Sequence, residues 1–310
     1  MSKLVEKVDE RLLTGRQEEN GTEAAVAIPG PAPNEQIQKL YEKLGSTYTL
    51  HTYTDEQTGL CVSYHLYTPE TVEEGKQYPM VVFIGDASTV GRDPAKPVRE
   101  CRGAMVWASE EEQKKHPCYV LVPQYPGVIL DDHEDFIITP YIELTGRLIR
   151  AAAASNPVDP ARIYGTGQSM GCMTSLILHA KYSDLFAACM FVDGQWDSTE
   201  LEGLKERTFL YFAAEGDLKA HDGMSELEQI WLKEGIPFGD FVLDAKDSPD
   251  KQNEDLARAL AQGNRINCIT WKLGSVLPDH IPVGTIEHMF AFDYAYRLES
   301  AREWLLAQRR

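Results

Sequence analysis

The sequence alternates between short apolar runs and segments with helical spacing, and this alternation limits the folds that the chain can adopt. Continuous apolar runs such as "YPMVVFIG" and "CYVLVPQ" are typical of strands that are buried on both faces. Further strand patterns are "ARIYGTG", "FAACMFVDG", "RTFLYFAAEGD" and "INCITWKLG", and helical patterns separate most of them. Repeated strand–helix alternation predicts an α/β domain with a mostly parallel central sheet, covered by helices on both faces.

Residues 1–46 are expected to form a helical appendage, and residues 47–310 the α/β domain. The start of the appendage has apolar residues at helical intervals, namely Leu4, Val5, Val8 and Leu12. Asn34 is expected to cap a second helix in "EQIQKLYEKLG". Docking on the body, contact with a second subunit and a flap over the active site are three alternative roles for this appendage. After it, "YTLHTYTD" and "CVSYHLYTPE" alternate in polarity and predict a hairpin.

Charge and composition exclude several classes of protein. The formal net charge of −18 disfavours binding to nucleic acid phosphates or anionic lipid. The sequence has no apolar stretch of membrane-spanning length, and its start lacks the apolar core of a secretory signal, so a cytoplasmic location is expected. The 6 cysteines form no C-x-x-C pair, which favours reduced, buried thiols. The acidic stretch "DDHEDF" has no recognisable ligand spacing, and we expect a solvated loop without a metal.

The segment "RIYGTGQSMGCMTSL" contains the pattern G-x-S-x-G at residues 167–171. A strand pattern precedes it and a helical pattern follows, which is the setting of a nucleophile elbow. A serine hydroxyl is a poor nucleophile at neutral pH unless a histidine takes its proton and a carboxylate orients that histidine. Ser169 is therefore the predicted nucleophile, with a structural turn serine as the alternative.

The longer phrase "DPARIYGTGQSMG" resembles the nucleophile segment of α/β-hydrolase serine esterases related to feruloyl esterases, polyhydroxybutyrate depolymerases and the predicted peptidases. The similarity extends from "SYHLYTPE" to "EHMFAFDYAYRLESAREWLL" and leaves the appendage unexplained. It implies the α/β-hydrolase fold and a triad in the chain order serine, acid, histidine. It also implies that the reaction needs no metal and no organic cofactor.

The triad acid is predicted from its place after a strand. Asp217 follows the run "FLYFAAEGD" at the edge where catalytic groups of parallel sheets gather, and the resemblance makes it the acid. Glu215 is the rival. Asp193 and Asp197 end the previous strand pattern, and we expect them in a pocket wall or a cap.

The catalytic histidine is predicted from its place before the last helix. His288 stands in "GTIEHMFAFDYAY", where the family has its catalytic histidine. His280 in "LPDHIPVG" is the competitor, but it lies farther from the closing helix.

The oxyanion hole is expected to take one donor from the amide of Met170 and a second from the loop after "MVVFIG". Here the sequence departs from the family, because Ile84 and Gly85 replace the usual His-Gly. The amide of Asp86 is the predicted second donor, with that of Ala87 as the alternative. Because a carboxylate beside a developing oxyanion is unfavourable, the Asp86 side chain is expected to turn away or to be paired.

Two residues are candidates for substrate binding, Gln168 and Trp196, although ordinary packing is an equal alternative for Trp196. Cys172 is expected to pack under the elbow. Only a short segment separates "FVDG" from "RTFLYF", which predicts a minimal cap and an accessible site.

These features predict a serine carboxylic-ester hydrolase that acts through an acyl-enzyme. The resemblance adds aromatic (feruloyl-type) or carbohydrate-linked esters as the substrate class. The expected partner is a small-molecule or carbohydrate-linked ester, with no nucleic acid and no membrane, and with a homo-oligomer formed through the N-terminal segment as an option. The alternatives are a serine peptidase or acyltransferase with the same triad, and a non-catalytic binding protein of this fold.

Overall fold

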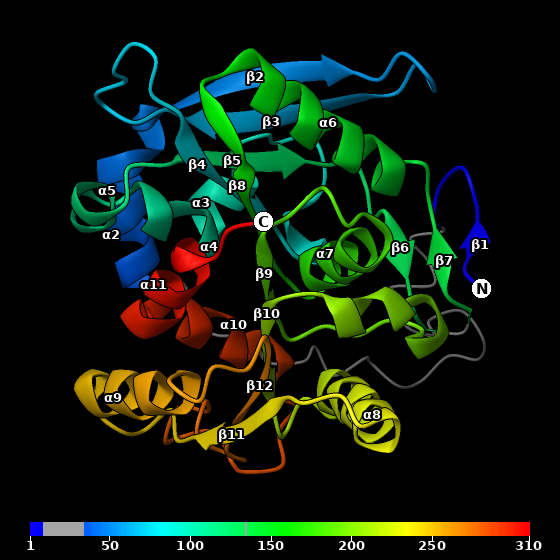
Figure 1. The fold of residues 1–310 in the computed structure, drawn as a ribbon, viewed down its shortest axis with the longest axis vertical. Coiled ribbons are helices and arrows are strands. Elements are labelled where there is room, and N and C mark those ends of the chain that lie inside the picture. Colours follow the sequence, from blue (N-terminus) through cyan, green and yellow to red (C-terminus); the bar gives the residue numbers. More distant parts are fainter. Residues whose placement is uncertain (9–33, 134) are drawn as a thin grey trace, which may run out of the picture.

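The structure is a computed structural model that describes residues 1–8, 34–133 and 135–310. In this part of the chain, a 9-stranded sheet forms the centre of the molecule, in the order β11-β12-β10-β9-β8-β4-β5-β3-β2 (Figure 1). The strands are β2 (Tyr48–Thr54), β3 (Cys61–Tyr67), β4 (Tyr78–Ile84), β5 (Tyr119–Gln124), β8 (Val158–Gln168), β9 (Ala188–Val192), β10 (Phe209–Ala214), β11 (Gly239–Leu243) and β12 (Ile266–Trp271).

The sheet is mostly parallel, as the alternation of strand and helix patterns predicts. The pairs β2–β3 and β3–β5 are antiparallel, and every pair from β5 through β4, β8, β9, β10 and β12 to β11 is parallel. The predicted hairpin is therefore β2 and β3. The strands β4, β5, β9, β10 and β12 are buried along their whole length, which explains their continuous apolar sequences.

Helices cover both faces of the sheet (Figure 1). Alternate residues of β4 separate the two cores, because Val81 and Phe83 belong to one apolar cluster and Met80, Val82 and Ile84 to the other. The helices are α2 (Glu35–Leu44), α3 (Lys96–Glu100), α4 (Arg102–Met105), α5 (Glu110–Lys115), α6 (Tyr141–Ser155), α7 (Met170–Lys181), α8 (Leu218–Glu234), α9 (Pro249–Leu260), α10 (His288–Arg297) and α11 (Glu299–Ala307). No helix in the described ranges is both long enough and apolar enough to span a membrane.

The N-terminal segment differs in part from its prediction. Instead of a helix, Lys3–Leu4 form strand β1, which pairs with β7 (Ile137–Ile138), and β7 also pairs with β6 (Leu130–Asp131). The reason is that β7 offers free backbone groups: Lys3 N–H donates to the carbonyl of Phe136 at 2.7 Å. Helix α6 follows β7 and begins at Tyr141, directly after Pro140. Leu12 lies outside the described residues.

Helix α2 forms where the sequence predicts it. The Asn34 side chain accepts a hydrogen bond from the amide of Gln36 at 3.0 Å, as an N-cap residue does. Ile37 and Leu44 are buried in the core cluster that α3 and α4 also line. This helix therefore docks on the body of the molecule, while the division of the chain at residue 46 stays a prediction.

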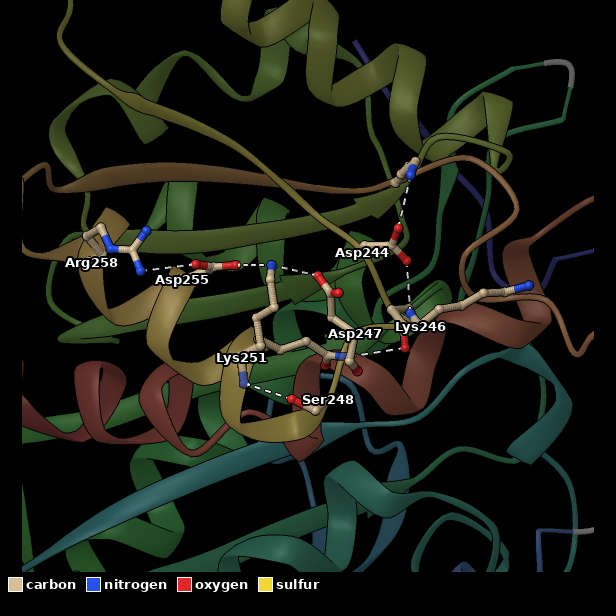
Figure 2. A network of polar contacts seen from close by, with 10 residues as sticks. Asp244, Lys246, Asp247, Ser248, Lys251, Asp255 and Arg258 are labelled. Atoms are coloured by element: carbon tan, nitrogen blue, oxygen red, sulfur yellow. Dashed lines mark hydrogen bonds and ion pairs between the residues drawn. The ribbon is translucent and has the colours of Figure 1, made fainter.

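Helix α9 begins at Pro249, and Ser248 is its N-cap residue. The Ser248 hydroxyl accepts a hydrogen bond from the amide of Lys251 at 3.3 Å (Figure 2). Pro249 is the first residue of the helix, a position where its missing N–H is not needed. The Lys251 ammonium lies between the carboxylates of Asp247 (2.8 Å) and Asp255 (2.7 Å). These charges are on the surface, where such pairs stabilise little.

Candidate active site

The turn from β8 to α7 is a strained elbow with Ser169 at its tip. Ser169 has φ 50° and ψ −116°, a conformation that residues with a side chain rarely adopt. The flanking glycines permit the turn. A Cβ on Gly167 would lie 2.5 Å from the carbonyl carbon of Gly171, and a Cβ on Gly171 would lie 1.9 Å from the Ile84 oxygen. The sequence pattern thus forms the strand–turn–helix that it predicts.

The structure brings Ser169, His288 and Asp217 together from three separate loops. His288 Nε2 lies 2.8 Å from Ser169 Oγ, and His288 Nδ1 lies 2.5 Å from Asp217 Oδ2. Asp217 follows β10, and His288 is the first residue of α10. Because a carboxylate can only accept here, Nδ1 carries the proton in the neutral ring and Nε2 accepts from the serine hydroxyl.

The surroundings of His288 make its imidazole a stronger base. Burial alone lowers its pKa, but the hydrogen bond and charge of Asp217 outweigh burial. The charge of Asp86 acts in the same direction, and the pKa is raised from its usual value. The arrangement can therefore draw a proton from Ser169.

Asp193 is a second buried carboxyl group near the first. It is fully buried, has φ 45°, and accepts a hydrogen bond from the amide of Ala214 at 2.8 Å. Burial, together with the charge of Asp217, raises its pKa well above the ordinary range, which favours the neutral form. It does not form the expected pocket wall, because its side chain lies in the interior, whereas Asp197 caps a short 3-10 helix, η4 (Ser198–Glu200).

The rival residues take other positions. Glu215 is exposed, and its Oε2 accepts from the amide of Leu273 at 2.9 Å. His280 is exposed in the loop after β12. Neither of these two side chains makes a hydrogen bond to Ser169 or His288 among the described residues.

The two predicted oxyanion donors are both placed at the start of a helical turn. Met170 is the first residue of α7, and Asp86 precedes η2 (Ala87–Thr89). No described residue accepts a hydrogen bond from either amide, so both remain available to a ligand. The Asp86 carboxylate is paired, as expected: it accepts from Gln168 Nε2 at 2.7 Å and from the amide of Ser88 at 2.8 Å.

Cys172 lies beneath the elbow, as predicted. Its side chain is fully buried, and its Sγ is 3.6 Å from the carbonyl oxygen of Gly194. Burial raises the pKa of this thiol well above its usual value, so it is a packing group.

The two candidate substrate-binding residues have different surroundings. Trp196 is buried, with its indole N–H 3.1 Å from Ser2 Oγ and its ring edge-to-face with Phe136. Its one donor is used inside the protein, which favours the packing alternative, and a binding role for Trp196 stays a prediction. Gln168 is also buried and bonded to Asp86, yet it lines a cavity.

This cavity has a volume of about 830 Å³ and lies between α2, the loop after β4 and α10. Tyr41 of α2 and Phe292 of α10 are among its lining residues. Ser169, His288 and Asp217 do not line this cavity, but the ring of Phe292, which does, lies edge-to-face with the His288 ring at a centroid distance of 4.9 Å. Its volume is typical of pockets for small molecules.

The acidic stretch after β5 forms a local cluster of Asp131, Asp132 and His133. Protein groups already engage it: Asp132 contacts Lys219 at 2.8 Å and Gln195 at 2.6 Å. His133 Nδ1 lies 2.5 Å from Asp131 Oδ1. These contacts hold the cluster within the protein, and the absence of a metal there stays a prediction.

Glu287, which directly precedes His288, is a buried residue that the sequence did not single out. Its Oε1 accepts from the amide of Gly274 at 2.5 Å, and its Oε2 from the amide of Gly216 at 3.3 Å. The one available signal was an acidic residue adjacent to the candidate histidine.

Comparison with known structures identifies the fold. A thermostable esterase aligns at 26% identity with a TM-score of 0.62, over 86% of this chain and 64% of that chain. A structure named FAE aligns at 13% identity with a TM-score of 0.51, over 92% and 98% of the two chains. A ferulic acid esterase aligns at 13% identity with a TM-score of 0.47, over 61% and 87%.

No protein-family model matches the chain, and no curated protein matches it. The chain spans 64% of the length of the thermostable esterase. The predicted fold is confirmed: the chain has the α/β-hydrolase fold, with a mostly parallel sheet and helices on both faces. Between β9 and β10 it forms only the short 3-10 helices η4 and η5 (Glu202–Glu206).

Proposed function

We propose that the chain is a serine carboxylic-ester hydrolase that works through an acyl-enzyme. The observation that carries the proposal is the continuous series of hydrogen bonds from Asp217 through His288 to Ser169, at the tip of a strained elbow. The similarity to a thermostable esterase at 26% identity supports it.

In the first half of the proposed reaction, Ser169 Oγ attacks the ester carbonyl carbon as its proton passes to His288 Nε2. Negative charge develops on the carbonyl oxygen, and the amides of Met170 and Asp86 are the proposed donors to it. The bond to the leaving alcohol then breaks, and His288 returns the proton to the alcohol oxygen.

In the second half, His288 takes a proton from water, and the resulting hydroxide attacks the acyl carbon. As the second tetrahedral intermediate collapses, the bond between the acyl carbon and Ser169 Oγ breaks and His288 Nε2 returns the proton to Oγ, which releases the carboxylic acid and restores the hydroxyl. Asp217 holds the imidazole in one tautomer and stabilises the imidazolium form in both halves.

Aromatic or carbohydrate-linked esters are the proposed substrates. The cavity next to His288 supports this class, because it is lined by aromatic rings and by polar side chains, including Tyr41, Phe292 and Gln168. The proposed binding role of Gln168 follows from its position next to Ser169.

The test is hydrolysis of a panel of p-nitrophenyl and methyl hydroxycinnamate esters by the native protein and by Ser169→Ala. We expect turnover that disappears in the variant, because the nucleophile is lost. Ser248→Ala, the same substitution at the cap of α9, is the matched control and should keep full activity. Equal turnover in native protein and Ser169→Ala would refute the assignment, and an anilide of the best acyl group would separate ester from amide cleavage.

A further inference from the structure

Glu287 is a buried acidic residue that the proposed reaction does not use. Its side chain is completely buried, and no described cation lies within ion-pair distance of it. Burial raises the pKa of this carboxyl group above its usual value. A buried carboxyl group without a cation is unfavourable in a fold unless specific hydrogen bonds compensate for it.

The compensating hydrogen bonds come from two different loops. Oε1 accepts from the amide of Gly274 in the loop after β12, at 2.5 Å. Oε2 accepts from the amide of Gly216 in the loop after β10, at 3.3 Å. The backbone of Glu287 makes a third bond, because its own amide donates to the Gly216 carbonyl at 3.2 Å.

These bonds connect the two partners in the proton relay. Gly216 directly precedes Asp217, and Glu287 directly precedes His288. One side chain therefore joins the acid loop, the loop after β12 and the start of α10, just where the acid and the imidazole must meet. The contact between Asp217 Oδ2 and His288 Nδ1, at 2.5 Å, joins the residues that directly follow Gly216 and Glu287.

The fit between Glu287 and Gly216 is close. A Cβ on Gly216 would lie 2.4 Å from the Glu287 carboxyl carbon, so only glycine leaves room for the side chain. Gly274 has φ 75°, a left-handed conformation that lets its amide point at Oε1 without strain. The two loops therefore leave space for the Glu287 carboxyl group and direct the amides of Gly216 and Gly274 toward it.

We infer that Glu287 is a positioning residue, which sets the placement of His288 relative to Asp217 by bonding to both flanking loops. This inference rests on the proposed function. It goes beyond it by giving a role to a residue that touches neither the substrate nor Ser169. A displacement of about 1 Å at a reacting group can lower a rate by about 100-fold.

The test is Glu287→Gln, which keeps the shape of the side chain. It replaces one acceptor oxygen with an amide group that must face an N–H donor of the protein. We expect kcat to fall by about 10- to 100-fold while KM changes by less than about threefold, since the substrate contacts are unaltered. Glu112→Gln is the matched control: Glu112 is equally buried but bonds to Arg302 at 2.6 Å, and we expect its kcat to stay unchanged.

A second readout does not depend on activity. The proton between His288 Nδ1 and Asp217 should give a far-downfield ¹H NMR signal in the native protein, because the contact is short. In Glu287→Gln we expect this signal to shift or disappear, whereas Glu112→Gln should retain it. An unchanged signal in Glu287→Gln overturns the proposal, whatever happens to kcat.

A failure of the proposed ester hydrolysis can be distinguished from a failure of the positioning role of Glu287. If the native protein hydrolyses no ester, the proposed function fails, while the NMR signal still tests the positioning role. If Glu287→Gln does not fold, Gly216→Ala serves instead, because its Cβ displaces the Glu287 side chain and keeps the carboxyl group. We expect the same loss of the signal, and its persistence in a folded Gly216→Ala overturns the proposal.

Discussion

The elbow makes one strong prediction about Gly171. A Cβ at this position would lie 1.9 Å from the carbonyl oxygen of Ile84, 2.5 Å from the Ile84 carbonyl carbon and 2.9 Å from the Gly85 oxygen. All three atoms belong to the backbone of β4 and the loop that follows it, so no rotamer change can relieve the contacts. The Gly171→Ala variant must therefore separate α7 from β4 by about 1.5 Å to reach ordinary van der Waals contact.

Two opposing contributions determine how much Gly171→Ala changes the free energy of unfolding. Alanine in a helix is favoured over glycine by about 0.5–1 kcal/mol, whereas overpacking costs about 1–3 kcal/mol. We therefore expect Gly171→Ala to lower the free energy of unfolding by about 1–2 kcal/mol. In a chain of this size, that loss corresponds to a fall in Tm of about 2–8 °C.

We expect Gly171→Ala to lose more activity than its lower stability alone would explain. Ile84 and Gly85 lead directly to Asp86, whose amide is the proposed oxyanion donor, so the shift displaces the donor relative to Ser169. Such a displacement predicts a loss in kcat of about 100-fold. The assays are thermal unfolding and the hydrolysis of p-nitrophenyl esters.

A matched control is Gly146→Ala, inside helix α6. There the nearest atoms to an added Cβ are side-chain carbons of Leu178 and Tyr182 at 3.6 and 3.7 Å, which is ordinary contact. This variant should be more stable than the native protein by about 0.5–1 kcal/mol and fully active. If Gly171→Ala were as stable and as active as Gly146→Ala, the described geometry of the elbow would be wrong.

Three further predictions concern charge. Asp217→Asn should lower kcat by about 10⁴-fold, measured on the best ester, because the imidazole loses the acceptor that fixes its tautomer. The pKa of His288 is raised and its neutral form is the base, so kcat/KM should decline as pH falls through a pKa above 6.5, and a pH–rate profile with its midpoint below 6.5 would contradict this. Arg147→Ala should lower the free energy of unfolding by about 2 kcal/mol at neutral pH, because Arg147 makes two hydrogen bonds to buried Asp55. The Arg147 side chain holds the pKa of Asp55 at about 2, so urea titrations should show the difference fading as pH falls from the ordinary Asp value toward 2, and a constant difference would refute it.

Much of the fold could be predicted because its signals are local. The runs in β4, β5, β9, β10 and β12 are apolar throughout, since each strand is buried on both faces. Strand β1 could not be predicted, because it is held by backbone bonds to a strand more than a hundred residues away and Leu4 is exposed. Single-segment periodicity carries no information about such a partner.

The residues of the candidate site could also be predicted only in part. The positions of Ser169, Asp217 and His288 were predictable because each follows or precedes a strand or helix with a clear pattern. For Trp196 the sequence left substrate binding and packing open, because its burial depends on Ser2 and Phe136, which come from distant segments. Glu287 was missed because its role lies in bonds to the amides of two glycines, and these leave no pattern in its own neighbourhood.

The most direct test of the central claim is covalent labelling of the native protein with a small fluorophosphonate, followed by digestion and mass spectrometry. The proposed mechanism predicts one adduct, on Ser169, formed much more slowly in His288→Ala because the proton acceptor is gone. A native protein that takes up no label, or carries it on a different serine, would contradict the assignment of Ser169 as the nucleophile.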